Sequence, residues 1–116
     1  STEKTKPDLL DRLEGFFTSE LGKNILYAKD KPGFIANRIG VFSIAACIHH
    51  ADRLGLDFDT VDALTGTKLK RPKSATFRTA DLVGLDILKH VFEQFDQVLS
   101  DDPWHAYFKT PQWLEY

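Results

Sequence analysis

The sequence predicts a mainly α-helical protein, and two observations support this. Apolar residues recur at three- and four-residue spacing along most of the chain, as in amphipathic helices. Glycines follow several of these stretches, and a helix C-terminus favours a residue without a side chain. One short apolar stretch, residues 25–28, instead has the composition of a β-strand. We therefore expect helices throughout, with one strand near the N-terminus.

The first expected helix covers residues 8–21. Pro7 suits a first helical position, and Gly22 suits the residue that ends a helix. One apolar stripe runs along it: Leu10, Leu13, Phe17 and Leu21. The strand expected at residues 25–28 follows directly. A single strand has no ladder partner and is not stable alone, so this pair of elements is an unusual start for a helical domain.

The stretch Asp30–Arg38 joins the expected strand to the longest helix of the chain. Pro32 disfavours helical backbone at Lys31, and Gly33 permits a turn that a side chain would resist. Helical spacing then runs from Phe34 to about Leu54, with apolar residues on two faces, which predicts burial on more than one side.

Asn37 falls in the first turn of this helix, beside free N–H groups and the positive end of the helix dipole. Its amide is well placed to hold the carbonyl oxygen of a ligand. The alternative is that the amide satisfies the helix N-terminus or a turn.

Shorter helices are expected after Gly55. Asp57 or Asp59 can cap a helix that Gly66 ends, and Ser74 or Thr76 can cap a helix over residues 75–83. Residues 67–74 between them are a loop. The remaining expected elements are a helix over 86–100, an aromatic segment at 104–108 and a short last helix from Pro111.

Composition limits the class of protein. With 116 residues, 42% of them hydrophobic and 28% charged, the chain has the size and composition of one globular domain. A net charge of −2 gives no general reason to expect a nucleic acid or an anionic membrane as partner. One cysteine, Cys47, rules out an internal disulfide. No apolar run approaches the roughly 18 residues of a membrane span, so we expect a cytoplasmic protein.

The sequence contains no G-x-G-x-x-G motif, so a dinucleotide site within these residues is not expected. Four histidines are present, but His49 and His50 are adjacent and point in different directions on a helix. His90 and His105 have no partner at metal-ligand spacing. We therefore expect no metal site.

Two stretches together resemble the C-terminal helical domain of the 3-hydroxyacyl-CoA dehydrogenases, most closely the long bacterial members that also carry an enoyl-CoA hydratase region. The first is Lys-Asp-Lys-Pro-Gly-Phe-Ile-Ala-Asn-Arg-Ile, residues 29–39. The second is Arg-Pro-Lys-Ser-Ala-Thr-Phe-Arg-Thr-Ala-Asp-Leu-Val-Gly-Leu-Asp, residues 71–86. They lie in family order, and the resemblance covers most of the chain.

The resemblance implies a helical domain like the C-terminal domain of 6-phosphogluconate dehydrogenase over residues 30–116, truncated at its C-terminal end. Residues 1–29 would then be the last helix and strand of a preceding nucleotide-binding domain. The parent enzyme would oxidise (3S)-3-hydroxyacyl-CoA with NAD in fatty-acid β-oxidation, as a homo-oligomer. The family's catalytic histidine and its paired glutamate lie in the nucleotide-binding domain, so this chain alone would be inactive.

Asn37 matches the asparagine of the family's Pro-Gly-Phe-x-x-Asn-Arg motif, whose amide would hydrogen-bond the substrate's 3-oxygen. Lys73, Ser74 and Phe77 are further candidates for substrate binding. The basic loop 68–73 could contact the phosphates of CoA or an RNA backbone, or it could simply be solvated. In many family members glycines occupy part of this loop, where Lys68 and Lys70 stand here. A rival interpretation of the whole chain is a non-enzymatic helical module that binds protein or nucleic acid through this loop.

Overall fold

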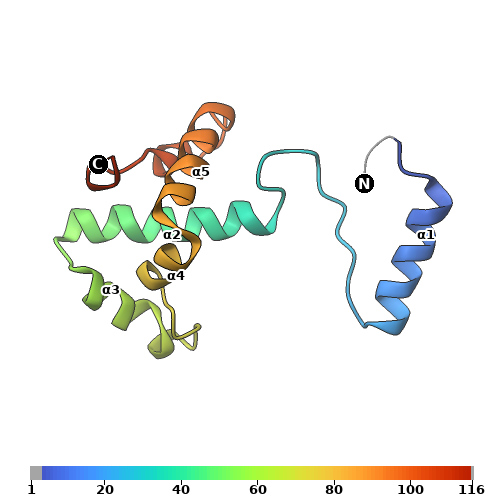
Figure 1. Cartoon of the computed structure of the whole chain (residues 1–116), viewed down its shortest axis with the longest axis horizontal. Helices are drawn as coiled ribbons and strands as arrows, with labels where there is room; N and C mark the ends of the chain where they lie inside the picture. The colour runs from blue at the N-terminus through green and yellow to red at the C-terminus, as the bar shows by residue number, and fades with distance from the viewer. Residues whose placement is uncertain (1–3, 116) are drawn as a thin grey trace.

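The computed structural model describes residues 4–115 as a helical body with an N-terminal arm (Figure 1). The long helix α2 runs through the body, α5 passes across its middle, and α4 lies to one side of it. The α-helices are α1 (Pro7–Gly15), α2 (Ala36–Leu54), α3 (Phe58–Thr65), α4 (Phe77–Val83) and α5 (Leu85–Val98). The shorter elements are a π-helix, η1 (Phe16–Glu20), and the 3₁₀ turns η2 (Thr67–Leu69), η3 (His105–Phe108) and η4 (Gln112–Leu114). The mainly helical prediction is confirmed.

The strand expected at residues 25–28 is not formed. Residues 22–29 have no regular secondary structure, and nothing in residues 4–115 pairs with them as a ladder. These residues are apolar, but a strand exists only through hydrogen bonds to a second strand. Instead, the Tyr27 hydroxyl donates to the carboxylate of Glu14 on α1, and this hydrogen bond raises the pKa of Tyr27.

The core lies where α2, α4, α5 and the C-terminal segment meet. Phe92, Phe95, Phe108 and Ile48 are its largest fully buried side chains. Ala45 and Ile48 of α2 pack in one cluster with residues of α4 and α5, and Phe95 and Phe108 form a second cluster beside it. These buried α2 residues lie on one of the two apolar faces expected for this helix. The other face is exposed near the N-terminal end of the helix, where Ile39 is 64% exposed.

The arm, α1 with η1 and the irregular segment after it, extends away from the body (Figure 1). No residue of α1 or η1 is buried, although the expected apolar stripe is present. The radius of gyration is 17.5 Å, whereas a compact domain of this length has about 13 Å. A groove of about 720 Å³ runs between α1 and residues 25–36, lined mainly by apolar side chains. The arm therefore presents an apolar face that the described residues do not cover.

The ends of two helices follow the sequence-based expectation. The Asp57 carboxylate caps α3 by accepting the Thr60 N–H at 2.7 Å, and this hydrogen bond lowers the pKa of Asp57. Gly55 ends α2 in the left-handed conformation, at φ +62°. The N-terminus of α4 differs, because neither Ser74 nor Thr76 caps it with its side chain. The capping carboxylate comes from Asp62, on α3.

Candidate functional site

The chain enters α2 through a tight turn that only glycine fits. Gly33 has φ +75°, and a Cβ built on it would lie 2.5 Å from Cζ of Phe95. Phe34 follows with φ 46°, and its N–H donates to the Lys31 carbonyl at 3.0 Å. The Arg38 N–H then donates to the Gly33 carbonyl at 3.1 Å. The turn is thereby held against α5, and it fixes where the first turn of α2 begins.

Asn37 is the second residue of α2 and is exposed, as expected. Within residues 4–115 its side-chain amide has no hydrogen-bond partner, so it does not cap the helix or close a turn. Residues three and four apart share a helix face, which aligns Asn37 with Val41. Val41 packs against the core on the α5 side. The amide thus lies at the exposed N-terminal end of the α2 face whose later residues pack against α5.

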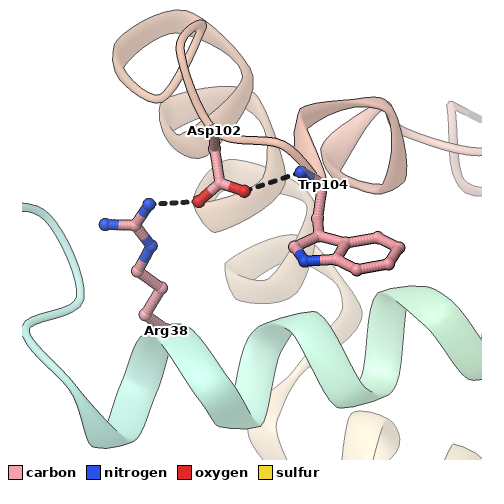
Figure 2. Close-up of polar contacts among 3 residues, drawn as sticks. All are labelled: Arg38, Asp102 and Trp104. Atoms are coloured by element: carbon pink, nitrogen blue, oxygen red, sulfur yellow. Dashed lines mark hydrogen bonds and ion pairs between the residues drawn. The ribbon is translucent and has the colours of Figure 1, made fainter.

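The next residue, Arg38, connects α2 to the segment that follows α5. Its guanidinium forms an ion pair with Asp102, and the other Asp102 oxygen accepts the Trp104 N–H at 2.8 Å (Figure 2). The Asp102 side chain is only 10% exposed. The hydrogen bond from Arg38, followed by that from the Trp104 N–H, lowers the pKa of Asp102. The ion pair therefore clamps the first turn of α2 to the turn that follows α5.

Beside this ion pair lies an apolar groove of about 400 Å³. It is lined by Phe34, Ile35, Arg38, Ile39, Phe42, Asp102, Trp104 and Phe108. Phe42 contacts the Trp104 ring, with centroids 5.7 Å apart. Arg38, Ile39 and Phe42 share a helix face that does not include Asn37. The groove and the Asn37 amide therefore lie on different sides of α2.

The other three candidate residues lie before and at the start of α4. Lys73 is exposed, whereas Ser74 is half-buried, with its hydroxyl 2.9 Å from that of Thr79. Phe77 is also half-buried and packs against the ring of Phe58, with ring centroids 4.3 Å apart. No hydrogen bond or ring contact in the described part of the chain links these residues to Asn37. They form a second, separate place on the surface.

Asp62 organises this second place, and sequence reasoning missed it. One carboxylate oxygen accepts the N–H groups of Thr76 and Phe77 at 3.0 and 2.6 Å, and the other accepts the Arg78 N–H at 2.9 Å. The Thr76 and Thr65 hydroxyls are 2.8 Å apart, which adds a further tie between the loop and α3. These partners are 14 to 16 residues from Asp62 in the sequence, so a local sequence pattern could not predict them.

Three of the four histidines contact other parts of the fold, whereas His90 is exposed, with its Nδ1 3.9 Å from the Glu93 carboxylate. His49 Nε2 lies 3.2 Å from the Lys109 carbonyl, and His105 Nε2 lies 2.8 Å from that of Asp96. The ring of His50 lies between Arg53 and Tyr107. Cys47 is half-buried on α2. Across residues 4–115, no three His, Cys, Asp or Glu side chains are grouped so as to hold a metal ion.

A helical body, an uncovered N-terminal arm and an exposed amide on a fixed helix start together define a mainly helical domain with an uncovered apolar face. The sequence identifies the family to which this domain belongs. The family described as the 3-hydroxyacyl-CoA dehydrogenase C-terminal domain matches residues 33–115, and the chain belongs to this family. The match starts at Gly33 and leaves α1 and the irregular segment outside it. The resemblance noted on the two motif stretches is thereby confirmed.

Curated relatives carry corresponding names. A protein of Deinococcus radiodurans named "Probable 3-hydroxyacyl-CoA dehydrogenase" is 48% identical over 87% of this chain and 29% of its own length. One of Bacillus subtilis with the same name is 39% identical over 97% of this chain and 14% of its own. The human "Hydroxyacyl-coenzyme A dehydrogenase, mitochondrial" is 29% identical over 90% and 32%. The chain thus spans less than a third of each relative.

No solved structure matches the chain significantly. Within the described residues, no helix has both the length and the apolar character needed to span a membrane.

Proposed function

We propose that this chain is the C-terminal part of an NAD-dependent 3-hydroxyacyl-CoA dehydrogenase that acts in cytoplasmic fatty-acid β-oxidation. Its role is to supply the Asn37 amide and one wall of the acyl-CoA cleft, and to contribute an oligomer interface. The single observation that carries the proposal is the state of Asn37. It is exposed, has no hydrogen-bond partner in residues 4–115, and stands on a helix start held by Gly33 and by the Arg38–Asp102 ion pair.

The chemistry of Asn37 follows from its donor group. The side-chain NH₂ can donate to the 3-oxygen of the substrate, and no internal hydrogen bond competes for it. Because the helix start is fixed in advance, little reorganisation is needed when charge on that oxygen changes during the reaction. Lys73, Ser74 and Phe77 would contact a different part of the same substrate, since they lie at the separate place near α4.

NAD would be held elsewhere in the longer protein. These residues contain no glycine-rich phosphate-binding turn, and the described part has no parallel strands to support one. The apolar face of the arm supports a neighbouring domain, since no residue of α1 or η1 is buried within residues 4–115. A covering domain would remove that face from water.

A second uncovered apolar surface supports the oligomer interface. Around the junction of α4 and α5, four apolar residues are exposed: Leu82, Val83, Leu85 and Ile87. They are continuous in sequence with the core helices, and patches of this kind are typical of contacts between subunits.

The test is an activity assay on the full-length gene product. We expect absorbance at the NADH wavelength to rise when (3S)-3-hydroxyacyl-CoA and NAD are supplied together. No change occurs when either is omitted. A full-length protein that folds yet forms no NADH from any 3-hydroxyacyl-CoA would contradict the proposal.

A further inference from the structure

Positive charge is concentrated in one segment of an otherwise acidic chain. Residues 63–80 contain five basic side chains and no acidic one, whereas the whole chain has a net charge of −2. Four of the five lie within six residues, in the loop between α3 and α4: Lys68, Lys70, Arg71 and Lys73. All four are exposed, and none forms an ion pair with a described carboxylate.

The loop that displays these cations is held in one shape. The Leu69 and Arg71 N–H groups both donate to the Gly66 carbonyl, at 3.0 and 3.2 Å. Lys70 and Ala75 adopt left-handed backbone conformations, at φ 55° and 52°. Gly66 is closely packed, since a Cβ there would lie 2.9 Å from the Asp62 carbonyl oxygen. Left-handed non-glycine residues persist only where the surroundings over-determine them.

Asp62 closes this loop but does not neutralise the positive charge of the loop's basic side chains. Its carboxylate is the acidic group bonded to the loop's C-terminal end, and both oxygens are committed to backbone N–H groups of residues 76–78. It therefore fixes the loop without pairing with the lysines. It also occupies the N-terminus of α4, so a bound anion would be held by the side chains of the loop and not by that helix end.

We propose that the Gly66–Ala75 loop binds the phosphate groups of a coenzyme A-type ligand. Its 3′-phosphate and diphosphate carry on the order of four negative charges at neutral pH, which the four loop cations match. The choice of ligand rests on the proposed function, whereas the anion site itself rests on the loop. This site adds Lys68, Lys70 and Arg71 to the substrate contacts and assigns them the nucleotide end of the ligand. A long polyanion such as RNA is the competing ligand.

The experiment follows amide signals of the ¹⁵N-labelled 116-residue chain during titration with coenzyme A at low salt. Dephospho-coenzyme A, pantetheine and a single-stranded RNA serve as comparison ligands. The test variant combines Lys68→Gln, Lys70→Gln and Arg71→Gln. The matched control removes three exposed cations from the arm: Lys23→Gln, Lys29→Gln and Lys31→Gln. Amide dispersion of each variant shows that it is folded.

We expect coenzyme A to shift amides of residues 66–75, dephospho-coenzyme A to bind more weakly, and pantetheine to have no effect. The loop variant should lose about tenfold in affinity, as three exposed charge contacts imply, and the arm variant less than about twofold. Equal loss in both variants, unshifted loop amides, or tighter loop binding by RNA than by coenzyme A would overturn the proposal. These outcomes do not depend on NADH formation by the full-length protein, so the two proposals can fail separately.

Discussion

Replacing Asp102 by alanine removes the clamp between α2 and the turn after α5. The change deletes a mostly buried ion pair with Arg38, whose side chain is 34% exposed, together with the acceptor for the Trp104 N–H. A hydrogen bond to a charged group contributes about 1.5–3 kcal/mol, and a neutral one about 1. Allowing for the exposure of Arg38, we expect the free energy of unfolding to fall by about 2–3 kcal/mol.

Such a loss corresponds to a fall in Tm on the order of 10 °C for a chain of this size. Urea unfolding at pH 7, followed by circular dichroism, measures it. Asp101→Ala is the matched control, because Asp101 is exposed and has no ion-pair partner among the described residues. We expect that control to change stability by less than about 0.5 kcal/mol.

The pH dependence tests the same clamp independently. Because the hydrogen bond from Arg38 lowers the folded-state pKa of Asp102, its contribution is fully present above the unfolded pKa of about 4. The contribution is then lost as pH falls through the folded pKa. The stability difference between the natural chain and Asp102→Ala should therefore be constant near neutral pH and shrink below about pH 4. A difference no larger than that of Asp101→Ala, or one unchanged down to acid unfolding, would refute this reasoning.

Three further outcomes are expected. Gly33→Ala should lower the free energy of unfolding by more than about 2 kcal/mol, because it adds both backbone strain and a clash. Gly22 has φ +60° but open space around it, so Gly22→Ala should lower it by only about 1 kcal/mol. Urea unfolding compares the two variants. Asp62→Ala should lower the free energy of unfolding by at least about 3 kcal/mol, because it leaves three N–H groups without their acceptor. The control Asp59→Ala should leave stability nearly unchanged. Hydrogen exchange should show the loss of protection at residues 76–78. The isolated chain should self-associate through the uncovered arm, where Phe17 is exposed. In sedimentation experiments at tens of micromolar, Phe17→Glu should shift the chain toward the monomer. A natural chain that sediments as a clean monomer would contradict this.

The sequence predicted those features that local spacing determines. The stop at Gly55, the cap at Asp57 and the place of Asn37 in the first turn of α2 all depend on residues a few positions apart. The partners that fix the two candidate sites lie far away in the chain. Arg38 and Asp102 are 64 residues apart, and Asp62 reaches across a loop.

The arm shows the same limit from the other side. The apolar stripe of α1 and the apolar residues at 25–28 were recognised, but whether they are buried, and whether 25–28 forms a strand, depends on residues that pack against them. The exposure of Ile39 on α2 has the same cause. An apolar pattern predicts that a helix face is buried, but it does not identify the residues that cover it.

The proposed role of Asn37 is tested most directly by steady-state kinetics of Asn37→Ala in the full-length gene product. Asn24→Ala, which removes an exposed amide from the arm, is the control. An amide that orients the reacting oxygen should lower kcat by roughly 10²-fold when removed, as single oxyanion-type donors do. Because the amide has no internal partner, stability should change by less than about 1 kcal/mol. An intact kcat/KM combined with a Tm many degrees lower would instead show that Asn37 is structural.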